Sequence, residues 1–187
     1  GCSAVVEPSV SNMGYITAVL SPEERERAGP KNGAITAVSI SLDPLGSVSV
    51  VIDSVPQGQG HRTAVSQVVA EVFGVAPRDV RVSSAFDSAL TNWSIASGNY
   101  SSRFGPAVAG TAHIAANRLR DRLAKRAAAQ LNVVENTIVF GNGKIYSSSN
   151  PENFLAFRRV ASAAHWSPGS LAAGVGSTIA ETAYWTP

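Results

Sequence analysis

The sequence contains a single cysteine, Cys2, among 187 residues. One thiol cannot form an intramolecular disulfide, and it cannot build a cysteine-ligated zinc site. Because stable disulfides belong to oxidising compartments, a chain without them fits a reducing one. We therefore expect a cytoplasmic protein.

An excess of one charge sign and long apolar runs are also missing. Fifteen Lys and Arg residues stand against 13 Asp and Glu residues, so the net charge is only +2. Such a charge favours neither nucleic acid nor an anionic membrane as a partner. No apolar run approaches the roughly 20 residues that span a bilayer, so we expect no membrane insertion. Five of the basic residues gather in residues 118–126, where we expect a solvated helix face.

Motifs for nucleophilic or metal-dependent catalysis are absent as well. The chain has no Gly-x-Ser-x-Gly turn, no His-x-x-x-His pair and no carboxylate cluster that suggests a metal site. We expect His113 to be packed or capped within a helix, and His165 to complement the dipole at a helix end. These absences make nucleophilic hydrolysis a poor fit and leave no recognisable metal-ligand motif.

The residues that are present predict a globular domain with a sizeable core, since 44% are hydrophobic and 15% charged. Alternating apolar residues predict strands at about 35–42 and 47–54, joined by a type I turn, Asp43-Pro44-Leu45-Gly46. Apolar residues at helical spacing predict a helix that follows Gly60 and ends at Gly74. The other expected elements are a strand near 79–85, a loop over 86–105, a helix at about 106–131, a hairpin around 141–143 and a helix at about 151–165.

This order, ββαβαββα, predicts an α+β fold with a mixed or antiparallel sheet and helices packed on it. Ser21-Pro22-Glu23-Glu24 is typical of a helix start, with Ser21 as the N-cap. We divide the chain into an N-terminal arm or connection over 1–33, an α+β subdomain over 34–166 and a Gly/Ser-rich C-terminal extension over 167–187.

Two glycine-containing loops, each before a helix start, are candidates for anion binding. Gly58 and Gly60 can adopt positive φ and expose backbone N–H groups, and the following helix N-terminus carries partial positive charge. The segment 97–105, Ser-Gly-Asn-Tyr-Ser-Ser-Arg-Phe-Gly, offers hydroxyl and guanidinium donors. From pattern alone, a phosphate cradle and a simple turn are equally good interpretations, and a metal site through His61 is a third.

Several motifs in order carry a family resemblance. The segment 56–61, Pro-Gln-Gly-Gln-Gly-His, precedes an amphipathic helix and then Asp-Val-Arg-Val at 79–82. It is accompanied by VEPSVSNMGYIT (6–17), DPLGSVSV (43–50), SGNYSSRFGPAVAG (97–110) and AETAYWTP (180–187). This set resembles the molybdopterin-binding large subunits of the molybdenum hydroxylases, the xanthine oxidase family. Within this family, the motifs most resemble those of aldehyde and carbon monoxide dehydrogenase large subunits. The chain resembles an internal fragment of such a subunit.

The resemblance implies a molybdenum cofactor, often a molybdopterin cytosine dinucleotide, whose dithiolene ligates the metal. The protein then needs no metal ligand. The residues that the resemblance assigns to cofactor contact are Gly58, Gln59, Gly60, His61, Ser101, Ser102 and Arg103. Phe104 departs from the family pattern, because a second Ser or Thr is usual there.

In such enzymes an aldehyde, carbon monoxide or an N-heterocycle is oxidised or hydroxylated, and electrons pass to iron–sulfur and FAD subunits or domains. The family's general base is a Glu after Gly-Val-Gly, whereas Ser177 follows Gly-Val-Gly here. We therefore expect the fragment to be inactive and without stably bound cofactor when alone. Its expected partners are the rest of the large subunit and the iron–sulfur and FAD components, with self-association through exposed apolar surface. A non-catalytic scaffold or assembly domain that kept the fold is the alternative.

Overall fold

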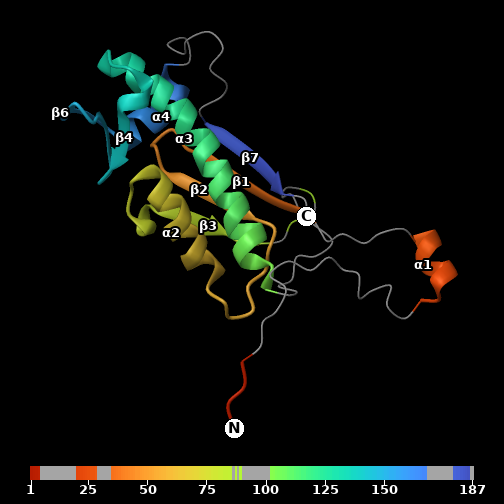
Figure 1. Cartoon of the computed structure of the whole chain (residues 1–187). Helices are drawn as coiled ribbons and strands as arrows, with labels where there is room; N and C mark the ends of the chain where they lie inside the picture. Colours follow the sequence, from red (N-terminus) through yellow and green to blue (C-terminus); the bar gives the residue numbers. More distant parts are fainter. Residues whose placement is uncertain are drawn as a thin grey trace.

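The structure is a computed structural model and describes residues 1–4, 20–28, 35–85, 87, 89, 102–167 and 179–185. It confirms the α+β fold class, with a mixed sheet and a smaller antiparallel sheet against which helices pack (Figure 1). The larger sheet has the order β3-β2-β1-β7, and the smaller one has the order β4-β5-β6. The strands are β1 (Thr36–Leu42), β2 (Val48–Ile52), β3 (Val80–Ser83), β4 (Ile138–Gly141), β5 (Lys144–Ser147), β6 (Asn150–Ala156) and β7 (Ala180–Trp185).

The α-helices are α1 (Pro22–Ala28), α2 (His61–Phe73), α3 (Gly110–Leu131) and α4 (Phe157–Trp166). Shorter helical segments are η2 (Pro77–Asp79), η4 (Phe104–Ala109) and η5 (Glu135–Thr137). The short helix α1 begins as expected: Ser21 Oγ accepts the N–H of Glu24, and the Glu24 carboxylate accepts the N–H of Ser21. This reciprocal pair is a capping box, which satisfies two backbone donors at a helix start.

The first hairpin is confirmed. β1 and β2 pair antiparallel with Ile40 opposite Val50, and apolar residues of both strands are buried in alternation. The turn is held by Asp43, whose Oδ1 accepts the N–H groups of Leu45 and Ser47 at 2.8 Å each. The hairpin therefore follows directly from its alternating pattern and its turn residues.

Helices α2 and α3 lie against the larger sheet and against each other (Figure 1). α2 connects β2 to β3, which run parallel, so a helical crossover is needed between them. α3 buries small residues, among them Ala112, Ala115 and Ala116, which allow close packing. Together these elements form the main core, and its fully buried members include Val38, Ile40, Val65, Val69, Phe73, Leu119 and Leu123.

The expected order of elements is wrong in two places. Residues 150–156 were expected to start a helix, but they form β6 and pair with β5, and the helix begins only at Phe157. β6 is almost wholly exposed, so it lacks the buried alternation by which a strand is recognised. Phe154 is 42% exposed and lies under the Lys144 ammonium group.

The second error concerns the C-terminal extension, where no strand was expected. Residues 180–185 form β7, which pairs antiparallel with β1, and Ser39 Oγ lies 2.8 Å from Thr182 Oγ1. Only Ala183 of this strand is buried, so its apolar pattern is short. The domain boundaries at 33/34 and 166/167 stay a prediction. β7, which lies after the second boundary, pairs with β1 and completes the larger sheet.

The basic stretch on α3 is only in part the solvated face that was expected, since Arg118 and Lys125 are exposed but the other basic residues are not. The Glu181 carboxylate of β7 pairs with Arg122 at 2.7 Å and with Arg118 at 3.5 Å. Arg126 is only 4% exposed. His113 was expected to be packed or capped, but it is exposed and lies beside Asn117. The arginines thus fasten α3 to its neighbours.

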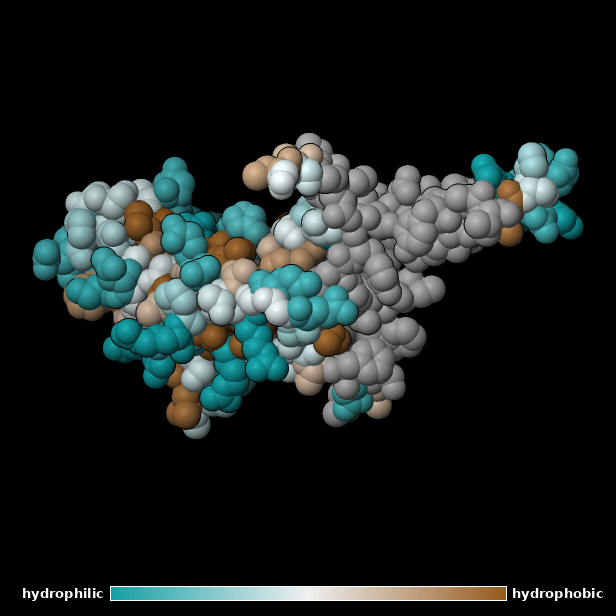
Figure 2. All heavy atoms as spheres, turned by 90° about the horizontal axis from the view of Figure 1, so that it is seen from below, coloured by the Kyte–Doolittle hydropathy of each residue, from teal (hydrophilic) through white to brown (hydrophobic). Residues whose placement is uncertain are grey.

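The described surface is mostly hydrophilic on the face seen in Figure 2, with small and separate apolar areas. The most exposed large apolar side chains are Leu45, Trp166 and Val134. Among the described residues, no helix is both long enough and apolar enough to cross a membrane.

Candidate functional site

One edge of the larger sheet gathers buried polar side chains. Because β2 and β3 are parallel and β1 is antiparallel to them, the ends of β2 and β3 lie at the same edge as the start of β1. Asp53 and Ser54 follow β2, Ser84 follows β3 and Thr36 opens β1, and all four are buried. Carboxyl ends of parallel strands are common ligand sites in sheets with helical crossovers.

The glycine loop between β2 and α2 lies at this edge. Gly58 and Gly60 have φ values of 103° and 72°, which favour glycine. A Cβ built on either residue would have no described atom within 4 Å, so the backbone borders open space. Gln59 is exposed, and its side-chain oxygen accepts the backbone N–H of Gln57 at 2.6 Å. α2 starts directly after Gly60, which supplies no side-chain cap to its first N–H groups.

His61 joins this loop to the second glycine-containing segment. Its side chain is fully buried, and Nδ1 lies 3.4 Å from Ser54 Oγ. The imidazole stacks on the Phe104 ring, with centroids 3.9 Å apart and planes 1° from parallel. The described parts of the chain contain no group of three or more metal-ligating side chains around His61 or elsewhere. The stack therefore brings together the segments before α2 and before α3.

The other predicted site residues divide between surface and interior. Ser102 is exposed and has a φ of 53°, a left-handed conformation that is uncommon for serine. Arg103 is 2% exposed; its Nη2 donates to Thr36 Oγ1 and to the carbonyl of Ile35. Arg103 thus anchors the segment to the start of β1, a role that its position in a polar loop did not indicate. Ser101 lies outside the described residues.

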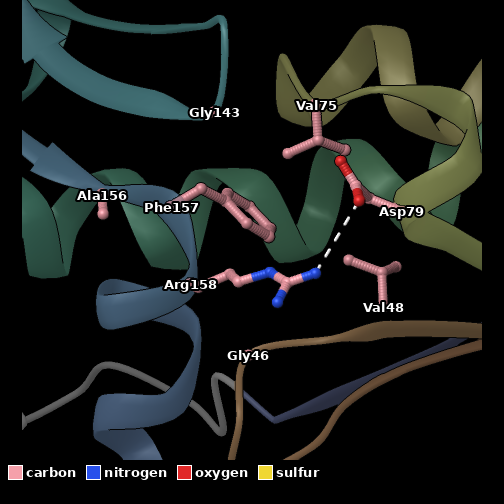
Figure 3. Close-up of a pocket in the computed structure, with 8 residues that line it drawn as sticks. All are labelled: Gly46, Val48, Val75, Asp79, Gly143, Ala156, Phe157 and Arg158. Carbon is pink, nitrogen blue, oxygen red and sulfur yellow. Dashed lines mark ion pairs between the residues drawn. The ribbon is translucent and has the colours of Figure 1, made fainter.

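A pocket of about 180 Å³ lies elsewhere, beside the β1–β2 turn (Figure 3). Val48, Val75 and Phe157 give it apolar walls, and the Asp79–Arg158 ion pair spans it with 3.7 Å between Oδ1 and Nη2. This turn is at the opposite end of the hairpin from Thr36 and Asp53. None of the pocket's described lining residues is a predicted site residue, so the pocket is separate from the glycine loop.

Comparison with known proteins identifies the family of the chain. A family model described as a molybdopterin cofactor-binding domain matches residues 1–187. The chain belongs to this family. The match agrees with the resemblance read from the ordered motifs and identifies the chain with molybdenum hydroxylase large subunits.

Two curated relatives of this molybdopterin cofactor-binding domain are named as the large subunit or large chain of an enzyme. The nicotine 6-hydroxylase large subunit of Paenarthrobacter nicotinovorans is 29% identical over 147 residues, which are 79% of this chain and 18% of that one. The carbon monoxide dehydrogenase large chain of Afipia carboxidovorans is 30% identical over 148 residues, which are 75% of this chain and 18% of that one. The chain therefore spans about a fifth of the length of these relatives.

Solved structures share the fold. Quinoline 2-oxidoreductase from Pseudomonas putida 86 superposes with a TM-score of 0.74 at 28% identity, over 83% of this chain and 19% of that one. A reconstituted CO dehydrogenase from Oligotropha carboxidovorans superposes with a TM-score of 0.70 at 24% identity, over 81% and 18%. The second likeness supports the fold alone.

The sequence did not predict the contacts between distant residues at this edge of the larger sheet. The His61–Phe104 stack joins residues 43 positions apart, and Asp53 accepts the N–H of Ala37 at 2.9 Å across 16 positions. The departure from family pattern at Phe104 was the one available signal for the stack. No local pattern indicated the bond from the Ala37 N–H to the Asp53 carboxylate.

Proposed function

We propose that this domain binds part of a molybdopterin cofactor at two segments, Gly58–His61 and Ser101–Arg103, within the large subunit of a molybdenum-dependent oxidoreductase. The observation that carries the proposal is the His61–Phe104 stack, because it holds the two segments side by side. Membership of the molybdopterin cofactor-binding family supplies the chemical class of the ligand.

The residues present fit such a group. Gly58 and Gly60 border open space in the described structure, so an anionic ligand can approach their backbone N–H groups closely. The N-terminus of the 13-residue helix α2 adds partial positive charge beside them. Bound there, the cofactor would supply the redox-active metal, held by its own dithiolene.

Each site residue has a distinct part in this proposal. The Gln59 amide, exposed at the loop, donates to or accepts from the pterin, and the Ser102 hydroxyl adds a donor from the second segment. Arg103 acts through its neighbours: bonded to β1, it positions Ser102 rather than touching the ligand. His61 likewise positions Gly60 from its buried stack on Phe104.

The finer assignments rest on the resemblance to the family. The cofactor is proposed to be the cytosine dinucleotide, and the substrate to be an aldehyde, carbon monoxide or an N-heterocycle. Relatives named for nicotine, carbon monoxide and quinoline favour this range. Iron–sulfur and FAD components and the rest of the large subunit are the proposed partners, in the cytoplasm. The general base is proposed to lie outside this chain, which is then inactive alone.

A scaffold function is the second candidate. Two observations favour it: Phe104 stands where the family usually has a hydroxyl donor, and the Arg103 guanidinium is turned to β1. Both remove ligand donors from the second segment. A scaffold would keep the fold and its contacts to the rest of the subunit while carrying no cofactor.

The test is the molybdenum and nucleotide content of the large subunit that contains this domain. We expect about one molybdenum per subunit in the unchanged protein and several-fold less in Gln59→Ala. Gln67→Ala is the matched control, because Gln67 is an exposed glutamine on α2 beyond the loop. Equal molybdenum content in all three proteins would refute the assigned contact, and metal-free unchanged protein would favour the scaffold.

A further inference from the structure

The pocket beside the β1–β2 turn is framed by chain segments that contact one another. The Gly143 N–H donates to the Gly74 carbonyl at 2.7 Å, and the Phe157 N–H donates to the Gly143 carbonyl at 2.8 Å. Gly46 lies so close to Arg158 that a Cβ on the glycine would overlap the Arg158 backbone. The end of α2, the β4–β5 turn, the start of α4 and the β1–β2 turn thus form one frame. Because backbone contacts fix this frame, the pocket is preformed.

The inner walls of the pocket are apolar and continuous with the core. Val48 and Phe157 are each 2% exposed, and the Phe157 ring packs against Phe73 with centroids 5.4 Å apart. Val75 forms a further wall from the segment after α2 (Figure 3). The volume of about 180 Å³ is near that of an apolar cavity of about 150 Å³ that holds benzene. It lies below the roughly 300–1,000 Å³ of larger ligand sites, so the pocket admits a single ring.

The ion pair that spans the pocket leaves room for a polar partner. Asp79 Oδ1 and Arg158 Nη2 are 3.7 Å apart, which is longer than the roughly 2.7–2.9 Å of a direct charge-assisted hydrogen bond. The two side chains are 41% and 63% exposed, so a molecule from solvent can reach both of them. Asp79 and Arg158 are the only charged residues among the described lining residues, so the charge of the lining is balanced. The pocket therefore favours an uncharged ligand that carries both a donor and an acceptor.

We propose that this pocket binds a small cyclic amide, an uncharged ring compound with adjacent N–H and C=O groups. The ring lies against Val48, Val75 and Phe157, where burial of its apolar surface is favourable. The amide N–H donates to Asp79 and the carbonyl accepts from Arg158, so one ligand serves both charged groups. An open-chain amide is trans, with these two groups on opposite sides, whereas a small ring holds them on one edge. This site does not depend on the cofactor loops.

Binding is tested on the purified protein by NMR titration with δ-valerolactam, a six-membered cyclic amide. We expect saturable shifts of the Gly143 and Phe157 backbone amides, because both residues line the pocket. The N-methyl derivative of the same lactam is the matched ligand control. It keeps the ring and the carbonyl but lacks the N–H that donates to Asp79, so it should bind about tenfold or more weakly.

Two substitutions on α4 test the role of the guanidinium. Arg158→Met should weaken binding of the lactam about tenfold or more, because the donor to its carbonyl is lost. Arg159→Met is the matched control, since Arg159 is the adjacent exposed arginine and does not line this pocket, and it should bind as the unchanged protein does. Both arginines are exposed, so both variants should fold, and thermal unfolding without ligand checks this.

A third variant tests the location of the ligand. Val75→Phe places a larger side chain in the cavity, so it should abolish binding. The proposal is overturned if the lactam shows no saturable binding to the unchanged protein, or if Val75→Phe binds it equally well. Equal affinity for the two lactams, or equal weakening by the two arginine substitutions, would also overturn it, because the ion pair would then have no part in recognition.

Discussion

The two glycines that flank α2 provide a sharp test of packing. Gly60 precedes the helix and Gly74 follows it, with φ values of 72° and 62°. Substitution by alanine places a methyl group on the same left-handed backbone at both sites. At Gly60 that group meets no described atom within 4 Å, but at Gly74 it would overlap the backbone of Phe140 and Gly141. The two substitutions therefore differ in the space available to the added methyl group and hardly differ in backbone conformation.

The free energies of unfolding follow from these two terms. A left-handed alanine costs about 1–2 kcal/mol, and the stiffer unfolded chain returns about 0.4–1 kcal/mol. Gly60→Ala should then destabilise the fold by about 1 kcal/mol. Gly74→Ala adds overpacking, typically about 1–3 kcal/mol and at the upper end against backbone atoms. It also strains the bond from the Gly143 N–H to the Gly74 carbonyl, so we expect a total of about 4 kcal/mol.

Thermal or urea unfolding measures the difference. For a chain of 187 residues, about 3 kcal/mol corresponds to a melting temperature roughly 6–12 °C lower for Gly74→Ala than for Gly60→Ala. If both variants lose the same stability, the close approach of α2 to the β4–β5 turn does not exist as described. The Gly60→Ala variant also tests the proposed function. If it folds but carries less cofactor, the open space beside Gly60 is a ligand site.

Three further predictions concern other contacts. Glu181→Gln should cost about 1–2 kcal/mol in urea unfolding, because one carboxylate serves two arginines, and the loss should shrink in high salt; an unchanged midpoint would contradict it. Phe104→Leu should speed hydrogen exchange of the His61 loop amides, while Phe104→Tyr keeps the stack and the slower exchange. The pKa of Asp43 is lowered, chiefly by the backbone N–H of Ser47. The stabilisation that ionised Asp43 contributes to the fold is therefore complete above about pH 4, where the unfolded carboxyl titrates, and it is lost as pH falls through the lower folded pKa. Asp43→Asn should remove this part of the acid dependence of unfolding.

Local chemistry predicted the parts of the fold that depend on neighbours in sequence. The β1–β2 hairpin follows from alternation and from Asp43 at the first position of its turn. The end of α2 follows from Gly74, whose left-handed conformation closes the helix. In both cases the residues that determine the element lie within it or directly beside it.

Elements stabilised by distant partners escaped prediction. β6 is exposed along most of its length and is defined by hydrogen bonds to β5, so its own residues carry little signal. The candidate site shows the same division. Positive φ at Gly58 and Gly60 was predictable from residue type. The inward turn of Arg103 was not, because it depends on Thr36, 67 positions earlier.

The pairing of β1 with β7 has a consequence for how the chain folds during synthesis. Ser39 and Thr182 meet across 143 positions, whereas β1 and β2 pair within one short turn. At roughly 5–20 residues per second, β7 leaves the ribosome about 7–29 s after β1. Until then, the outer edge of β1 offers unpaired backbone groups to any extended neighbour, which is a route to aggregation. The pairing of β1 with β7 thus joins residues far apart in the sequence and raises the contact order of the fold. We expect the formation of this pairing to limit the folding rate.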